Sequence, residues 1–245
     1  MLTLFKKVLR LVIPKQKVWE IKNRQNIPSM EWSLMNIKKL GFYPDFVIDV
    51  GAYDGEWTQM IKVIFPSAKV LMIEAQQDKE IALKAVTQKS PGTYFHIDLL
   101  GAESGKQVTF NVNSTVSSVL EEYKPNNFKK DLRGLQTLDN IIENYSKLGF
   151  PDFIKLDVQG YELEVLKGFS ENLTHVQFVL CEVSLIEINK GCPLISDVIR
   201  FMDDIGFITY DICSFIRRPL DRALWQTDIL FIKKTHLLNQ NKYWD

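Results

Sequence analysis

Two acidic residues and two glycines lie close together in the segment VIDVGAYDG, residues 47–55. The preceding run Phe46-Val47-Ile48 is apolar and does not alternate, which is typical of a strand buried on both faces. Gly51 and Gly55 permit a sharp bend and a close approach of the backbone to a bound molecule. A helical pattern begins at Glu56. A strand, a glycine turn and a helix in this order favour a site for a nucleotide-like ligand.

The turn does not match the dinucleotide fingerprint Gly-x-Gly-x-x-Gly. Counting from Gly51, the second and third glycine positions hold Tyr53 and Glu56. An acid at the head of the helix would repel a pyrophosphate rather than hold it, which argues against NAD and FAD. Asp49 lies just before the first glycine. A carboxylate at that place suits a ligand with a cationic amino-acid end, and S-adenosylmethionine has that character.

Two further acids end the next two predicted strands. Glu74 ends the segment VLMIE, where the ribose hydroxyls of the ligand need an acceptor, and Asp98 ends YFHID, near the expected adenine edge. We expect a larger residue at Gly51 to block the ligand without unfolding the chain. The complete set of expected cofactor-binding residues is Asp49, Gly51, Ala52, Tyr53, Gly55, Glu74, Ala75, Asp98 and Leu99.

The segment FIKLDVQGYELEVLKG, residues 153–168, narrows the interpretation. It resembles the hallmark of the FkbM family of S-adenosylmethionine-dependent methyltransferases, which is close to IKIDVEGAELEVLKG. This chain departs from the hallmark at Gln159, where the family usually has Glu, and at Tyr161, where it has a small residue. The family pattern is also matched by the turn at 47–55, by the acid Glu74 and by the segment LQTLD, which lies before the helix that precedes the hallmark. The resemblance therefore covers roughly residues 45 to 233.

The resemblance implies a fold and an activity. The fold is an α/β, doubly wound, seven-stranded and mostly parallel sheet of the class I, Rossmann-like methyltransferase type, with the last strand, 226–233, antiparallel. The activity is methyl transfer from S-adenosylmethionine, usually to an oxygen of a small-molecule acceptor such as a sugar or glycan precursor. Transfer to nitrogen or to a protein side chain, and a cofactor-binding domain without catalysis, are the alternatives.

A hydroxyl acceptor must lose a proton as it attacks, and a carboxylate can accept that proton. Asp157 is the first candidate for this base because it ends the strand beside the cofactor turn, and Glu182, in VLCEVS at the end of the next strand, is the second. We rank Lys155 lower because we expect it on the other face of the strand. The spacing typical of metal ligands is absent and we expect no metal, although Asp157 and Glu182 could share a divalent ion.

The elements that position these residues alternate along the chain. This alternation predicts a largely parallel sheet with helices on both faces, in a domain of residues 46–245 that follows a helical lead-in of residues 1–45. The expected strands are 46–50, 70–74, 94–98, 153–158, 177–183, 206–212 and 227–233, and the expected helices are 30–40, 56–65, 78–88, 137–148, 160–168 and 193–204.

The segment from Gly101 to Arg133 interrupts the alternation. It contains one short predicted strand, Lys106 to Val112, and then a long polar loop. Long loops in compact domains are usually binding surfaces or lids. We expect the loop 113–127 to close over the acceptor through hydroxyls such as those of Ser117, Ser118 and Tyr123, with little effect on cofactor affinity.

Composition limits the partners. Thirty basic and 30 acidic residues give a net charge of zero, so nucleic acid receives no electrostatic support. Three widely spaced cysteines favour a reducing cytoplasm. The first residues, MLTLFKKVLRLVIP, form an apolar run that Lys6, Lys7 and Arg10 interrupt and that is too short to span a bilayer. This segment is either a helix packed on the domain or a peripheral anchor on an anionic membrane; the sequence does not determine the oligomeric state.

Overall fold

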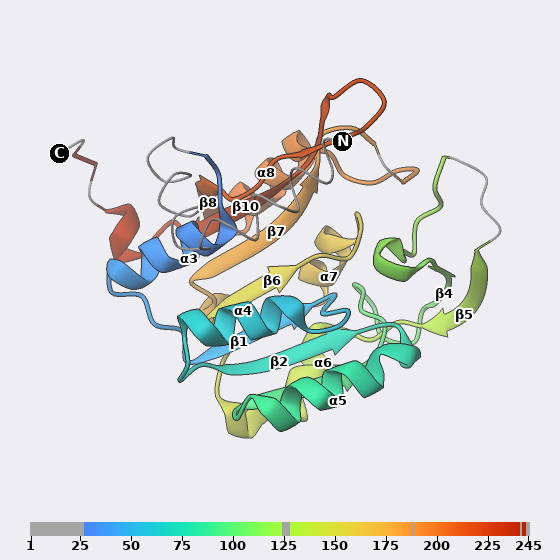
Figure 1. Cartoon of the computed structure of the whole chain (residues 1–245), viewed down its shortest axis with the longest axis horizontal. Coiled ribbons are helices and arrows are strands. Elements are labelled where there is room, and N and C mark those ends of the chain that lie inside the picture. Colours follow the sequence, from blue (N-terminus) through green and yellow to red (C-terminus); the bar gives the residue numbers. More distant parts are fainter. Residues whose placement is uncertain (1–26, 124–127, 188, 241, 244–245) are drawn as a thin grey trace, which may run out of the picture.

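The computed structural model describes residues 27–123, 128–187, 189–240 and 242–243. The segment expected to form the first N-terminal helix lies outside these residues. A central sheet has the strand order β3-β2-β1-β6-β7-β10-β8, and β9 pairs with β10 (Figure 1). Its strands are β1 (Phe46–Val50), β2 (Lys69–Glu74), β3 (Thr93–Ile97), β6 (Phe153–Leu156), β7 (Phe178–Ser184), β8 (Phe207–Ile212), β9 (Ile216–Arg217) and β10 (Leu224–Lys233).

The directions of these strands confirm the doubly wound, mostly parallel arrangement. The pairs β1–β2, β2–β3, β1–β6 and β6–β7 are parallel, whereas β10 runs antiparallel to β7 and β8. All seven predicted strands are present, and most of their ends lie within two residues of the predicted ends. The short strand β9 was not predicted, and it makes the described sheet eight-stranded.

Helices cover both faces of the sheet because each carries one apolar stripe. In α8, Val198 and Met202 are buried four residues apart, and in α3, Leu34 and Ile37 are buried three apart, which matches the helical repeat. One face carries α3 (Met30–Lys39), α4 (Glu56–Ile64) and α5 (Glu80–Lys89), and the other carries α6 (Leu138–Glu143), α7 (Glu162–Lys167) and α8 (Ile195–Asp204) (Figure 1).

The lead-in helix α3 belongs to the same core as the sheet. Leu34 and Ile37 pack in one buried cluster with Val47 of β1 and Ile61 of α4. In the described parts of the chain, no helix is long and apolar enough to cross a membrane. Short 3₁₀ turns complete the described helical elements, at Gln77–Lys79, Ser114–Val116, Ser146–Leu148, Leu173–His175 and Leu237–Asn239.

A small second sheet stands beside the main one. It pairs β4 (Gln107–Val112) antiparallel with β5 (Lys129–Gly134). The sequence predicted the first of these strands and missed the second, because KKDLRG is charged and lacks the apolar alternation of a half-buried strand. The chain between the two strands is the expected lid, of which residues 113–123 are described.

The topology marks one place in the sheet as a binding crevice. From β1 the chain winds outward to β2 and β3, and from β6 it winds in the opposite direction to β7. At such a switch point the loops diverge and leave a crevice beyond the carboxyl ends of the strands. The turn after β1, residues 51–55, and the turn after β6, residues 157–161, therefore flank the same space.

Candidate active site

A cavity of about 480 Å³ lies at this switch point, within the usual size range of small-molecule sites. It is bounded by the turn after β1, the ends of β2 and β3, the turn after β6, and the loop that follows β4. Seven of the nine expected cofactor residues line it, and Asp157 does too; these are Gly51, Ala52, Tyr53, Glu74, Ala75, Asp98, Leu99 and Asp157.

Three predicted site residues do not line the cavity. Asp49 lies behind it, fully buried, and Glu182 lies behind Gln159. Gly55 faces α5, where a side chain at this position would come within 2.9 Å of a Val86 methyl group. The role of Gly55 in this structure is therefore packing of the turn against its neighbouring helix.

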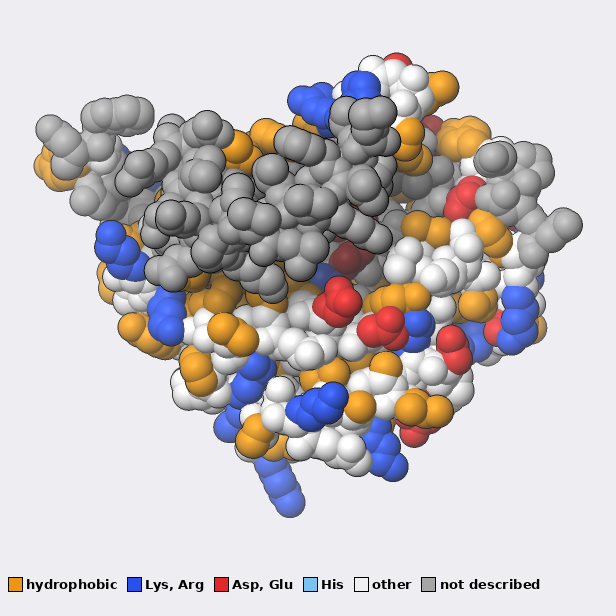
Figure 2. All heavy atoms as spheres, in the orientation of Figure 1, with side chains coloured by type: hydrophobic (Ala, Val, Ile, Leu, Met, Phe, Trp, Pro, Cys, Tyr) orange, Lys and Arg blue, Asp and Glu red, His pale blue; other side chains and the backbone are white. Residues whose placement is uncertain are grey.

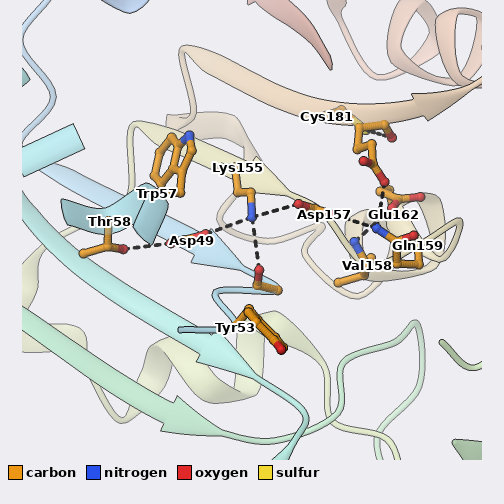
Figure 3. Close-up of polar contacts among 12 residues, drawn as sticks. Asp49, Tyr53, Trp57, Thr58, Lys155, Asp157, Val158, Gln159, Glu162 and Cys181 are labelled. Atoms are coloured by element: carbon orange, nitrogen blue, oxygen red, sulfur yellow. Dashed lines mark hydrogen bonds and ion pairs between the residues drawn. The ribbon is translucent and has the colours of Figure 1, made fainter. Parts of the chain in front are cut away.

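Asp49 and Lys155 form the base of the site. They are direct partners on the paired strands β1 and β6, and Lys155 Nζ lies 3.2 Å from Asp49 Oδ1 (Figure 3). Thr58 of α4 donates to the other oxygen of Asp49 at 2.7 Å. The Lys155 ammonium also donates to the carbonyl of Gly51 at 3.1 Å and lies 3.5 Å from Asp157 Oδ2. One buried cation therefore links the two turns that flank the cavity.

The expectation that Lys155 points to the opposite face from Asp157 is wrong. Residues two apart in a strand lie on the same face, and the structure places both side chains at the cavity. Applying this period correctly to IKLD would have identified Lys155 as a site residue. Burial alone would lower the pKa of Lys155, but the charges of Asp49 and Asp157 outweigh it and raise the pKa above its ordinary value, so the ammonium stays charged.

Gln159 joins the two predicted catalytic carboxyl groups. Its amide nitrogen donates to Asp157 Oδ1 at 3.0 Å and to Glu182 Oε2 at 2.9 Å. Gln226 donates to the same Glu182 oxygen at 2.8 Å. Burial, reinforced by Asp157 and other acids nearby, raises the pKa of Glu182 far above its ordinary value. Glu182 is thus neutral near pH 7, with Oε1 free to carry the proton, and Asp157 is the carboxylate that faces the cavity.

The amide of Gln159 makes contacts that the glutamate of the hallmark could not make. A glutamate at position 159 would place a third carboxylate between Asp157 and Glu182, whereas the glutamine donates to both. The amide also fills the place that a divalent ion shared by the two carboxyl groups would need.

Glu162 fixes the conformation of the turn that carries Gln159. Its Oε1 accepts hydrogen bonds from the backbone N–H groups of Val158 and Gly160, at 3.0 and 3.1 Å. Gln159 between them has a left-handed backbone, with φ of 56°. Burial raises the pKa of Glu162 to about 7, against the opposing effect of these backbone hydrogen bonds. In the sequence, Glu162 is recognisable only as part of the hallmark segment.

Glu74 has a structural role as well as its expected one. Its two oxygens accept from the backbone N–H groups of Tyr53 and Gln76, at 2.8 and 2.9 Å, and the side chain is buried. Glu74 therefore holds the turn after β1 against the end of β2. The side-chain amide of Gln76 also donates to Oε1, at 3.3 Å, so Oε2 is the oxygen that keeps a lone pair for a ligand hydroxyl.

Gly51 corrects one expectation about the turn. A side chain there would meet the backbone oxygen of Asp157 at 1.9 Å, and the backbone is left-handed, with φ of 73°. A larger residue would thus push β1 and β6 apart at their ends. We conclude that substitution of Gly51 would disturb the fold around the site as well as the binding of a ligand.

The loop after β4 covers the same cavity as the β1 turn. Thr115, Ser117, Ser118 and Val119 line it, although the loop was expected to cover only the acceptor. Ser114 ties the loop down: its hydroxyl lies 2.9 Å from that of Tyr53, and its carbonyl accepts from Gln76 at 3.0 Å. We therefore predict that this loop contributes to cofactor affinity, in place of the expectation from the sequence.

The charge of the cavity wall suits a cationic nucleoside. Among the described lining residues there is one positively charged side chain, that of Lys155, and it is already paired with carboxylates. The five acids are Asp54, Glu56, Glu74, Asp98 and Asp157. Such a wall repels the phosphates of a dinucleotide, whereas S-adenosylmethionine carries a sulfonium and no phosphate. Apolar groups between the acids, including Ala52 and Leu99, offer surfaces for an adenine ring.

The family model described as the Methyltransferase FkbM domain matches residues 49–209, about two thirds of the chain. The chain belongs to the FkbM methyltransferase family. All of the lining residues described above lie within the matched segment. The family assignment and the strand order of the chain establish the class I methyltransferase fold.

Individual relatives of this FkbM protein are distant. The hexuronic acid methyltransferase AglP of Haloferax volcanii is 26% identical over 144 residues, which are 57% of this chain and 56% of AglP. The match thus spans little more than half the length of that relative.

Two solved structures are similar to the chain at low scores. A precorrin-6y C5,15-methyltransferase from Geobacter metallireducens gives a TM-score of 0.47 at 10% identity, covering 85% of this chain and 88% of the other. Fibrillarin of Aeropyrum pernix, solved with natively bound S-adenosyl-L-methionine, gives 0.46 at 14% identity, covering 82% and 74%.

Proposed function

We propose that this protein is an S-adenosylmethionine-dependent O-methyltransferase that acts on a hydroxyl group of a saccharide. The observation that carries the proposal is the cavity at the switch point, in whose acidic wall the carboxylate of Asp157 is held between Lys155 and Gln159. When bound, S-adenosylmethionine supplies a methyl group on a sulfonium centre. Glu74 would accept from its ribose hydroxyls, and Ala52 and Leu99 would contact its adenine.

Asp157 is the residue that we assign as general base. Its side chain is 36% exposed, whereas Glu182 is buried and neutral. As the acceptor oxygen bonds to the methyl carbon, the bond from that carbon to the sulfonium sulfur would break and leave a neutral thioether, and the proton of the acceptor would pass to a carboxylate oxygen of Asp157. Lys155 and Gln159 each hold one oxygen of that carboxylate, which fixes its orientation before the acceptor arrives.

A sugar acceptor is favoured by the relative that is named for one, AglP, a hexuronic acid methyltransferase. The cavity lining is consistent with this choice because the hydroxyl of Tyr161 and the amide oxygen of Gln159 suit a polyol. We therefore place the acceptor between Asp157 and the loop after β4.

The test has two measurements. Isothermal titration should show that the full chain binds S-adenosylmethionine, and a panel of uronic acids and neutral saccharides should reveal methyl transfer to oxygen. Asp157→Asn should lower turnover by about 10²-fold or more, within the range for general-base catalysis, while it changes cofactor affinity by less than about fivefold. Asp78→Asn, at an exposed acid outside the cavity, is the matched control.

Absence of cofactor binding by the folded wild-type chain would contradict the proposal. Full activity of Asp157→Asn on the same acceptor would remove Asp157 as the base. Methylation of nitrogen alone, or of protein side chains alone, would replace the saccharide hydroxyl as the acceptor.

A further inference from the structure

A hairpin of unusual composition projects from the sheet. Residues 215–224, here named the basic hairpin, contain β9, the turn after it and the first residue of β10. The sequence FIRRPLDRAL has three arginines and one aspartate. Leu220 is 85% exposed, Phe215 51% and Ile216 40%. Figure 1 shows the segment extending beyond the body, and Figure 2 shows basic and apolar side chains together on that projection.

The tip of the basic hairpin is closed by its own hydrogen bonds. Arg218 N donates to the carbonyl of Ala223 at 3.0 Å, and Arg222 N donates to the carbonyl of Arg218 at 3.1 Å. The guanidinium of Arg218 contacts both oxygens of Asp221, at 2.7 and 2.5 Å. A loop fixed in this way loses little conformational entropy when it binds a partner.

The pairing of Arg218 with Asp221 leaves two uncompensated positive charges. Arg217 and Arg222 are exposed, and neither has an ion-pair partner among the described residues. The guanidinium of Arg217 instead donates to the carbonyl of Arg222 at 3.0 Å. The exposed surface of the hairpin is therefore cationic and apolar at once.

The basic hairpin lies at the edge of the sheet where the cavity opens. Gln226 of β10 pairs with Ser184, the last residue of β7, and also with Ile216. The residues between Ile216 and Gln226 therefore extend past the carboxyl end of β7. The candidate active site lies beyond the carboxyl ends of β1 and β6 in the same sheet.

We propose that the basic hairpin docks the protein on an anionic membrane surface. Arg217 and Arg222 would lie among the lipid phosphates, and the side chains of Leu220, Phe215 and Ile216 would enter the interface. Arginine gains from the negative potential of such a surface, and exposed apolar groups gain from leaving water. A single hairpin tip is small for a stable protein interface, and its exposed apolar side chains suit a lipid interface rather than a soluble polyanion.

The test is co-sedimentation of the full chain with vesicles of phosphatidylglycerol and phosphatidylcholine, compared with phosphatidylcholine alone. We expect binding to the anionic vesicles that weakens with added salt. Arg217→Gln with Arg222→Gln should lower the partition coefficient about tenfold, and Arg217→Lys with Arg222→Lys should keep it within about twofold. Leu220→Ser should lower it several-fold.

Matched controls lie on α5, which packs beside β3, the edge strand farthest from β8 and β10 in the strand order. Ile81 is 83% exposed, so Ile81→Ser removes a comparable apolar side chain, and Lys84→Gln with Lys89→Gln removes two exposed charges. Neither control should change vesicle binding. The proposal is overturned if the wild-type chain does not bind anionic vesicles, or if the hairpin variants bind as the wild type does. Retention on heparin without binding to vesicles would also overturn it and would indicate a soluble polyanion as the partner.

Discussion

Carboxyl groups of the same kind take different roles in this site because their surroundings differ. Asp157 is open to the cavity and stays beside the charged Lys155. Glu182 and Glu162 are enclosed by protein, and burial raises the pKa of both. Burial favours the neutral form of an acid. These surroundings assign Asp157 to proton transfer and the two buried glutamates to holding the turn beside it.

Glu74→Gln should weaken cofactor binding and lower stability together. A glutamine has one acceptor oxygen, so it cannot serve both Tyr53 N–H and Gln76 N–H and also accept from a ribose hydroxyl. Loss of a charged hydrogen bond predicts a weakening of about 1.5–3 kcal/mol by calorimetry. Urea unfolding should show a loss of about 1–2 kcal/mol as well, and Glu143→Gln, at an exposed helical acid, should show neither effect. Unchanged affinity would remove Glu74 from the cofactor site.

Glu162 should make stability depend on pH in a defined window. Its pKa rises from an ordinary 4.5 to about 7 in the folded chain, so between these values the folded state binds more protons than the unfolded state. The free energy of unfolding should therefore fall as pH rises from about 4.5 to 7. At 1.36 kcal/mol per pKa unit, the contribution is about 3 kcal/mol.

Glu162→Gln is a suitable test because both backbone hydrogen bonds go to one oxygen, which a glutamine keeps. Urea unfolding at pH 5 and pH 8 should show a smaller decrease for the variant than for the wild type. Buried acids away from the turn, such as Asp152, titrate in both proteins, so the difference reports Glu162 together with the effect of its charge on Glu182. Parallel decreases in the two proteins would contradict the assignment.

At the scale of elements, the sequence predicted best where one physical signal dominates. The buried strands β1, β2, β6 and β7 are continuous apolar runs, and their positions followed directly from that pattern. The acids that end them could be placed at one edge because parallel strands end together. Six predicted helices occur, although the one expected at 137–148 ends at Glu143 and is followed by a separate 3₁₀ turn.

The sequence failed where contacts between distant segments decide the structure. Strand β5 has a charged sequence and forms only because β4 offers a partner, and β9 forms on the free edge of β10. The ion pair of Asp49 with Lys155 depends on the register of β1 against β6, which no local pattern contains. The hydrogen bonds that tie Ser114 to Tyr53 and Gln76 are likewise non-local, and they hold the loop against the turn after β1.

The hydrogen bonds of Ser114 with Tyr53 and Gln76 should hold the loop after β4 in place over the cofactor cavity. Tyr53→Phe removes the hydroxyl that meets Ser114, and Gln76→Ala removes the donor to the Ser114 carbonyl. The double variant should speed hydrogen exchange in residues 113–119 and weaken S-adenosylmethionine binding about three- to tenfold, the range for one or two lost hydrogen bonds. Tyr43→Phe with Gln88→Ala, both at exposed positions, is the control. Faster exchange with unchanged affinity would confine the loop to the acceptor.

The whole molecule is organised around the point where β1 and β6 diverge. The largest core cluster packs one face of the sheet and a second packs the other, and the two turns meet at the edge between them. The backbone of Gly51 lies close against the carbonyl of Asp157. The buried ammonium of Lys155 contacts both the carbonyl of Gly51 and the carboxylate of Asp157. A change at this point should be transmitted to both halves of the sheet, because each half begins at one of these strands.

Gly51→Ala should therefore destabilise the entire fold. Gly41 is the matched control: its backbone is also left-handed, with φ of 96°, but no atom lies within 4 Å of the place that a side chain would occupy. Gly41→Ala should cost only the backbone strain, about 1–2 kcal/mol. Gly51→Ala adds the collision with the Asp157 carbonyl and should cost about 1–3 kcal/mol more in urea unfolding, with a loss of cofactor affinity. Equal losses in the two variants would show that the ends of β1 and β6 can separate freely.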